Sequence, residues 1–411
     1  MKRIFQLYRN AYGGLSQAAW ILALIMLINR SGSMVVPFLS VYLTVEVGLT
    51  LERAGIILSI FGLGSMAGSF LGGWLTDRFG QFRVQFLSLT VGGLLFFVMG
   101  EIRQFEWLAV WIFILSLVTD CLRPANASSI ALYARPENIT RAFSLNRMAI
   151  NLGFSIGPAV GGLLAAISYQ WLFVTDGLTC IMAGLLFFFF FRGRKPNTPM
   201  PVTEKAAHPA SQNIKKTAWH DARFLIFILC CTLFAIVFFQ LFFTLPLYYR
   251  DVYKLSEGGI GLLIGLNGLI VFLFEMVIVY LVGQKADIRM LIISGTLLVG
   301  LSFIMLIFIS DKWMLYLSMI VLSFAEIFAM PYMVTYTTQR SGPQTMGSYM
   351  GLYSLAYATA FVMAPFLGTR IIANIGYDCL WWTSAALSVL SAMGFYFVLR
   401  PQSSPITVAS T

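Results

Sequence analysis

Long apolar segments recur along this chain of 411 residues, each close to the length that a helix needs to cross a lipid bilayer. Such a helix takes about 20 predominantly apolar residues. Hydrophobic residues make up 59% of the sequence and charged residues only 11%, whereas about a quarter of a soluble protein is charged. We therefore predict an all-α membrane protein with twelve transmembrane helices, the first too long to be a cleaved signal peptide. The predicted helices are 18–44, 52–76, 84–101, 106–129, 143–166, 171–191, 224–248, 257–282, 288–309, 313–337, 347–374 and 380–399.

The formal net charge of +10 is unevenly distributed. If the N-terminus lies inside, most Lys and Arg residues fall in cytoplasmic segments, and two, Arg30 and Arg123, fall within predicted helices. Positively charged loops stay in the cytoplasm, so both termini are predicted to be cytoplasmic. The same distribution argues against a nucleic-acid partner. We expect a monomer in a bacterial inner (plasma) membrane.

One long polar segment, residues 192–222, divides the predicted helices into six and six. It is basic at its start and rich in proline, which is typical of a flexible linker. We predict a first bundle at 1–191, a cytoplasmic linker at 192–222 and a second bundle at 223–411. A plain spacer and a regulatory surface both remain open for the linker.

The two halves look like copies of each other at a fixed offset, which places Ile260 against Ala54 and Glu326 against Asp120. The same offset aligns Leu75 with Leu281, Arg83 with Arg289 and Trp107 with Trp313. Duplicated halves of helical membrane sequence are typical of secondary transporters, in which the substrate binds between the repeats near the bilayer midplane. The duplication therefore predicts transport.

The loop between the second and third helices runs Gly73-Trp-Leu-Thr-Asp77-Arg78-Phe-Gly80-Gln-Phe-Arg83. Gly80 permits a tight turn, and Asp77 can meet a basic residue or a helix N-terminus at the membrane surface. This motif resembles the cytoplasmic loop of the major facilitator superfamily, with Phe82 where a base is common. The second copy, residues 283–289, is degraded. The resemblance implies a conformational switch, whereas a solvated loop is the simpler alternative.

Helix 143–166 carries Gly153, Gly157, Pro158 and Gly161, which resemble the glycine-proline motif of the drug:proton antiporters in that superfamily. We assign these residues to the switch as well, because proline bends a helix and spaced glycines allow close approach. Small residues recur on the second, eighth and eleventh helices. In the superfamily these three helices and the fifth form the contact between the bundles, with the second helix beside the eleventh and the fifth beside the eighth. The small residues are Gly64, Gly68 and Gly72; Gly261 and Gly265; and Ala356, Ala360, Ala364 and Gly368.

Charged and polar residues inside the predicted helices are functional candidates, because a charge at mid-bilayer costs a few kcal/mol or more. Asp120, Glu326 and Glu275 are the proton-coupling candidates. A permanent salt bridge between Arg30 and Asp120 is the structural alternative, and Asp176 is expected to be structural. In the superfamily helices 1, 4, 7 and 10 line the cavity. The candidate substrate-binding residues are Arg30, Arg123, Asn126, Gln240, Phe239, Tyr332 and Tyr336.

The resemblance implies alternating access in a drug or lipophilic-metabolite:proton antiporter that works in export. We expect protons and a small organic molecule as partners, with the proton gradient as energy source, no cofactor and no metal site. The sequence has neither an ATP-binding glycine loop nor a Ser/His/Asp arrangement, so an enzyme is not expected. The alternative is uptake or facilitated transfer of a zwitterion such as a short peptide or an amino acid.

Overall fold

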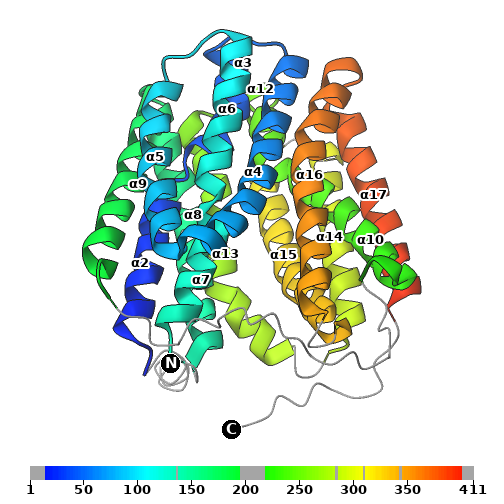
Figure 1. The fold of residues 1–411 in the computed structure, drawn as a ribbon. Coiled ribbons are helices and arrows are strands. Elements are labelled where there is room, and N and C mark those ends of the chain that lie inside the picture. The colour runs from blue at the N-terminus through cyan, green and yellow to red at the C-terminus, as the bar shows by residue number, and fades with distance from the viewer. Residues whose placement is uncertain are drawn as a thin grey trace, which may run out of the picture. The chain divides into compact units, whose positions relative to one another are not determined.

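The computed structural model describes residues 14–135, 138–194, 218–282, 286–308, 311–341 and 345–399, most of which are helical (Figure 1). Among them, 12 helices are long and apolar enough to cross a membrane. The predicted fold class is therefore confirmed, and each predicted span has an observed counterpart. Most of the predicted linker, and Gly283 to Lys285 of the second loop motif, lie outside the described residues.

Three of the twelve spans are divided into shorter helices. The first is α2 (Gln17–Ser31) with α3 (Val35–Val45), the fourth is α6 (Phe105–Asp120) with α7 (Leu122–Tyr133), and the seventh is α10 (Ala222–Phe238), α11 (Gln240–Phe243) and α12 (Leu245–Asp251). The remaining spans are α4 (Leu51–Phe79), α5 (Gln81–Met99), α8 (Ile139–Ala165), α9 (Gln170–Phe191), α13 (Glu257–Val282), α14 (Ile288–Phe308), α15 (Lys312–Arg340), α16 (Met346–Asn374) and α17 (Tyr377–Val398). A short 3-10 helix, η2 (Ala218–His220), precedes α10.

The described residues fall into two compact units that the chain enters more than once. Unit 1 is drawn from Met1–Met34, Gly64–Gly157 and Gln170–Ile214, and unit 2 from Val35–Leu63, Pro158–Tyr169 and Lys215–Thr411. These units cut across the predicted boundary at the linker, because two segments of the first half belong to unit 2. The division into two six-helix bundles stays a prediction.

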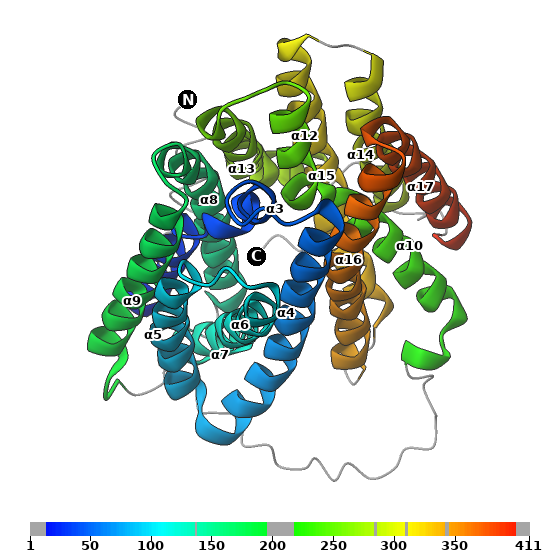
Figure 2. The same cartoon turned by 90° about the horizontal axis from the view of Figure 1, so that it is seen from above.

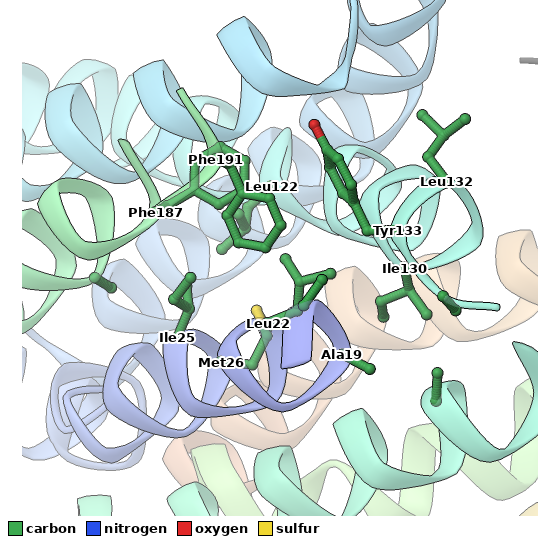
Figure 3. Packing of buried hydrophobic residues seen from close by; sticks show 14 of the residues in the cluster. Ala19, Leu22, Ile25, Met26, Leu122, Ile130, Leu132, Tyr133, Phe187 and Phe191 are labelled. Atoms are coloured by element: carbon green, nitrogen blue, oxygen red, sulfur yellow. The ribbon is translucent and has the colours of Figure 1, made fainter. Parts of the chain in front are cut away.

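The core of unit 1 forms where α2, α7 and α9 meet (Figure 3). Leu22, Ile25 and Met26 of α2 face Leu122 of α7 and Phe187 of α9 (Figure 3), and all five are buried. The three residues of α2 lie on one face because their spacing matches the helical repeat. In unit 2, α14 packs against α15 and α17, and α10 packs against α16 and α17 (Figure 2).

The starts of the first and seventh spans are held in the same way. Ser16 caps α2 by accepting from Ala19 N (3.2 Å), and its hydroxyl donates to Tyr133 O at the end of α7. Asp221 caps α10 by accepting from Phe224 N, and it binds Arg340 at the end of α15. In each half of the sequence, therefore, the start of one span is tied to the end of the span three positions later, as expected for repeats.

The Asp221 carboxylate makes the stronger of these two ties. Arg340 donates through Nε and Nη2, both at 2.7 Å, and Tyr349 donates its hydroxyl at 3.0 Å. The two-pronged guanidinium bond favours the ionised carboxylate, so it holds the pKa of Asp221 below the ordinary value of 3.8.

The small residues of α4 pack in two different directions. A Cβ added to Gly68 would overlap the carbonyl oxygen of Leu117, and one added to Gly72 would lie 2.6 Å from Cys121 Cα. Gly64 is equally close to Phe113 O. The prediction that these three glycines face the eleventh span was wrong: they allow α4 to approach α6 within unit 1. Gly55 and Gly62 make the predicted contact instead, against Thr369 and Phe361 of α16.

The other predicted strips divide in the same manner. Gly261 of α13 lies against the carbonyl of Pro158 and against Gly162, so the predicted pairing of the fifth and eighth spans is confirmed in unit 2. Gly368 of α16 instead faces Gln240 and Thr244 of the seventh span.

We predict that Gly68→Ala destabilises the protein, because the new methyl group overlaps backbone that cannot move aside. Overpacking of this kind costs about 1–3 kcal/mol. The measurement is the apparent Tm of the purified protein in detergent. The matched control is Gly351→Ala on α16, where an added Cβ would meet nothing within 4 Å. Equal Tm values for the two variants would contradict the proposed close approach.

We also predict that Asp221→Asn lowers the apparent Tm at neutral pH by the equivalent of about 1 kcal/mol, since a charged hydrogen bond becomes a neutral one while the cap is kept. The folded-state pKa is the lower one, so this contribution is present above the ordinary value of 3.8 and is lost as pH falls through the folded pKa. The Tm difference from the wild type should therefore shrink in that acidic range. The control is Asp311→Asn, at an exposed cap residue of α15 that makes no side-chain cap bond, and its Tm should equal that of the wild type. A Tm difference between Asp221→Asn and the wild type that does not change with pH would be inconsistent with the ion pair.

Candidate functional site

A buried carboxylate lies at the break in the fourth span. Asp120 ends α6 and Arg123 lies in the first turn of α7, where its Nε is 2.7 Å from Asp120 Oδ1. The aspartate side chain is 9% exposed and the arginine side chain is 58% exposed. The pair therefore has one buried acidic end and one accessible basic end.

Arg30, in the last turn of α2, completes this charged cluster in unit 1. It interacts electrostatically with Arg123 and Asp120, and its guanidinium lies 5.7 Å from the ring centroid of Phe154. Its buried Nε has no hydrogen-bond partner within the described part of the chain. The alternative of an Arg30–Asp120 salt bridge was wrong, because the ion pair joins Asp120 to Arg123, its neighbour three residues along the same span.

The break after Arg30 is supported by two other spans. A Cβ on Gly153 would lie 2.5 Å from Arg30 Cβ, and one on Gly157 would lie 3.1 Å from Arg30 O. On another side, Asp176 of α9 accepts from Met34 N at 3.0 Å. The glycines of α8 thus make room for the Arg30 backbone, and Asp176 satisfies an amide that the break leaves without a helical partner. This agrees with the structural role predicted for Asp176.

Asn126, about one helical turn after Arg123 on α7, belongs to a chain of buried polar side chains. Ser129 Oγ donates to Gln85 Oε1 (2.6 Å), and Gln85 Nε2 donates to Asn126 Oδ1 (3.4 Å). Asn126 Nδ2 in turn donates to Asn146 Oδ1 (3.4 Å). The network links α5, α7 and α8 and so fixes the segment that carries Arg123. Gln85 and Asn146 were not predicted, although a polar residue inside a span is the signal that identifies such positions.

Glu326 lies in unit 2, on α15. Asn267 of α13 donates to Glu326 Oε2 at 3.3 Å and to Ser323 at 3.1 Å. Asn267, likewise, was not predicted. Glu275, also on α13, is buried. The proton-coupling roles of Asp120, Glu326 and Glu275 stay predictions.

The predicted substrate-binding residues of the seventh span differ in their surroundings. Gln240 donates to Ala364 O (3.1 Å) and accepts from Thr244 (2.8 Å), so its amide is used to join the seventh span to α16. Phe239, at the break before α11, is half-buried among aromatic rings. Substrate contact by either residue stays a prediction.

The two candidate tyrosines of α15 lie in different places. Tyr332 is buried, and its hydroxyl has no partner among the described residues. Tyr336 packs on Phe227 with ring centroids 4.6 Å apart and interacts with Arg340, which places it beside the Asp221 cluster. Their predicted roles are untested.

The loop motif forms the turn that its glycine predicts. Gly80 has a φ of +84° and precedes α5. Asp77, Arg78 and Arg83 are exposed, and the Arg78 guanidinium lies 5.2 Å from the Trp74 ring centroid. Asp77 makes no ion pair within the described part of the chain. The switch roles of this motif, with Gly73, and of Gly153, Gly157, Pro158 and Gly161 stay predictions.

Within unit 2, residues from both halves of the sequence meet at one end of the helices. Arg250 of α12 donates to Thr44 of α3 (3.0 Å), and Tyr169 donates to Glu257 at the start of α13 (3.2 Å). Ser59 of α4 donates to Val362 O of α16 at 3.0 Å. These contacts join the halves by hydrogen bonds as well as by the small residues described above.

The sequence matches the family model described as the Major Facilitator Superfamily over residues 19–365 and 253–410. The chain belongs to this superfamily. It is therefore a transporter and an integral membrane protein, not an enzyme. The resemblance carried by the loop and helix-5 motifs is confirmed at the level of the superfamily.

Relatives with named functions are distant but cover most of the chain. A Na(+), Li(+), K(+)/H(+) antiporter of Planococcus maritimus is 25% identical over 90% of this chain and 92% of its own length. The quinolone resistance protein NorA of Staphylococcus aureus is 26% identical over 90% of this chain and 89% of its own. An auto-inhibited POT family peptide transporter has the same fold, with a TM-score of 0.77, 17% identity and coverage of 95% and 99% of the two chains.

We predict that Asn126→Leu destabilises unit 1 by about 1–3 kcal/mol, because it leaves the Gln85 and Asn146 amides without their partner. Gln85→Leu should cost a similar amount, and the double variant clearly less than the sum, as expected for residues of one network. The measurement is denaturant unfolding of the purified protein followed by circular dichroism. Asn374→Leu, which removes only an exposed bond to Arg370 O, is the control. Additive effects of the two network variants would rule out the hydrogen-bonded chain.

Proposed function

We propose that this protein exports lipophilic cations, drugs or metabolites, in exchange for protons, by alternating access in a bacterial inner membrane with both termini in the cytoplasm. The observation that carries the proposal is the Asp120–Arg123 pair inside a membrane span. An ionisable pair in that position is costly and is typical of proton and substrate pathways. Two relatives, a cation/proton antiporter and a quinolone resistance protein, support the same class.

The chemistry of the cluster suits proton exchange. With Asp120 ionised, the cluster formed with Arg30 and Arg123 carries one net positive charge; with Asp120 protonated, it carries two. Protonation therefore makes the potential around the cluster more positive, which disfavours a cationic substrate, as antiport requires. Protonation also weakens the bond to Arg123, so the exposed guanidinium is released when the proton binds.

Everted membrane vesicles test the proposal. Their cytoplasmic face is outward, so an exporter carries added cation into the lumen and protons out of it. Vesicles with an acidified lumen and a trapped pH dye should become more alkaline inside when ethidium is added. Vesicles from cells without the protein give the background. A lumen pH that stays at background would contradict proton-coupled export.

Asp120→Asn should abolish this alkalinisation, because a side-chain amide does not bind a proton at the pH of the assay. Exchange of labelled substrate down its own gradient should remain measurable. Asp311→Asn is the control and should behave as the wild type. Unchanged proton release in Asp120→Asn would remove this carboxylate from the coupling mechanism.

One observation favours a second candidate, the transfer of a zwitterion such as a short peptide or an amino acid. The buried Arg30 Nε has no partner among the described residues, and a substrate carboxylate is the natural acceptor for a guanidinium. A panel of dipeptides that raises the apparent Tm, while lipophilic cations leave it unchanged, would reverse the ranking of the two candidates.

A further inference from the structure

Three aromatic rings of unit 2 gather where the seventh span is interrupted. Phe239 lies between α10 and α11. Its ring meets Phe361 edge to face, with centroids 4.9 Å apart and planes at 86°. It meets Tyr357 in the same manner, at 6.2 Å and 82°. Tyr357 and Phe361 are one helical turn apart on α16, so they lie on one face of that helix.

These three rings are half-buried, unlike the closed aromatic core of the same unit. Phe234 and Phe243, on either side of Phe239 in the chain, are fully buried. The residues Phe239, Tyr357 and Phe361 are therefore only partly buried, near the middle of their spans. Tyr357 is also held in place, because its hydroxyl donates to Met333 Sδ at 3.5 Å.

A carboxylate accompanies the rings. Glu326 is half-buried, and it lies on the same face of α15 as Met333, two helical turns further on, whose sulfur accepts from the Tyr357 hydroxyl. Glu326 accepts a hydrogen bond from the Asn267 amide at 3.3 Å. The α15 span thus carries a carboxylate on the helix face that Tyr357 contacts.

This combination selects for one kind of ligand. Ring faces attract a cation through the ring quadrupole, most strongly where water is excluded, and a half-buried carboxylate adds direct Coulomb attraction. An apolar anion of the same shape would meet the same rings but would be repelled by the carboxylate. A strongly hydrated cation such as Lys or Na⁺ would lose more hydration than the rings replace, so bulky organic cations fit best.

We propose that Phe239, Tyr357, Phe361 and Glu326 form the subsite that receives the charged centre of a lipophilic cation. The inference rests on the proposed function and deepens it, because it assigns cation recognition to unit 2 and leaves proton exchange with Asp120 in unit 1. Tyr357 and Phe361 acquire roles that the motifs of the chain do not indicate.

Equilibrium binding to the purified full-length protein tests the subsite. The probe is radiolabelled tetraphenylphosphonium at pH 8, measured by equilibrium dialysis in detergent. Phe361→Ala and Tyr357→Leu should each weaken binding about three- to thirty-fold, the range expected for loss of one cation–π contact. Glu326→Gln should weaken it by about tenfold, while Phe361→Trp should retain it. Tetraphenylborate, which has nearly the same shape and the opposite charge, should bind more weakly than the cation, and Glu326→Gln should not weaken its binding.

The control is Phe366→Ala on the same helix, whose ring pairs with Arg370 instead (4.6 Å); it should bind the cation as the wild type does. The apparent Tm of each variant reports whether it is folded. The subsite is overturned if the wild type does not bind tetraphenylphosphonium, or if folded Phe361→Ala and Glu326→Gln bind it as tightly as the wild type. An equal loss of phosphonium and borate binding in Glu326→Gln would also overturn it. Intact binding by these criteria, combined with absence of ethidium-driven proton release in vesicles, would refute the antiport and leave the subsite standing.

Discussion

A backbone N–H or C=O group inside a bilayer has no water to bond to, so it must find its partner within the protein. The breaks in the spans show how this chain meets that condition. Beyond the end of α2, the buried amide of Met34 donates to Asp176 of α9. Where the seventh span is interrupted, the side chain of Gln240 joins α11 to a carbonyl of α16. At the first of these breaks, therefore, a neighbouring span supplies a bond to an amide that the interrupted helix does not pair, and Arg30 lies beside that break.

Close approach of helices is the second requirement, and it depends on glycine. Without side chains at 64, 68 and 72, the α4 backbone reaches the α6 backbone next to Asp120. Without side chains at 153 and 157, α8 reaches the backbone of Arg30. Both sets of glycines thus border the same charged cluster. The glycines of α4 pack against the span that carries Arg123, and those of α8 pack against the span that carries Arg30. The helix-5 motif is therefore linked physically to Arg30, in addition to any part that it takes in conformational change.

Most of the fold could be predicted from the sequence, because span length and apolar composition are local properties. The helix starts were predictable only to within a few residues, since caps such as Ser16 and Asp221 depend on partners far along the chain. Helix breaks were not predicted: the segment from Gln17 to Val45 has the length and mean hydropathy of one span, although the first break follows the polar run Asn29-Arg30-Ser31-Gly32-Ser33. The charged residues were found by the cost of burying charge. Their pairing was not, because spacing alone does not decide whether Asp120 binds Arg30 or Arg123. Tyr357 and Phe361 carried no signal, since an aromatic ring in an apolar span is ordinary.

The way in which the compact units share the chain bears on fragment complementation. Residues 35–63 and 158–169 fold with the second half of the sequence, and the shared spans α4 and α8 change unit in mid-helix, at Leu63–Gly64 and Gly157–Pro158. A polypeptide cut in the polar segment between Phe191 and Ala222 would yield two pieces, neither of which holds all of unit 2. The C-terminal piece alone would expose the surfaces of α13 and α16 against which Gly162 and Gly62 lie. Assembly of a working transporter from two separately made pieces would therefore complete one compact unit with residues from both pieces, which differs from docking two units that are each already complete.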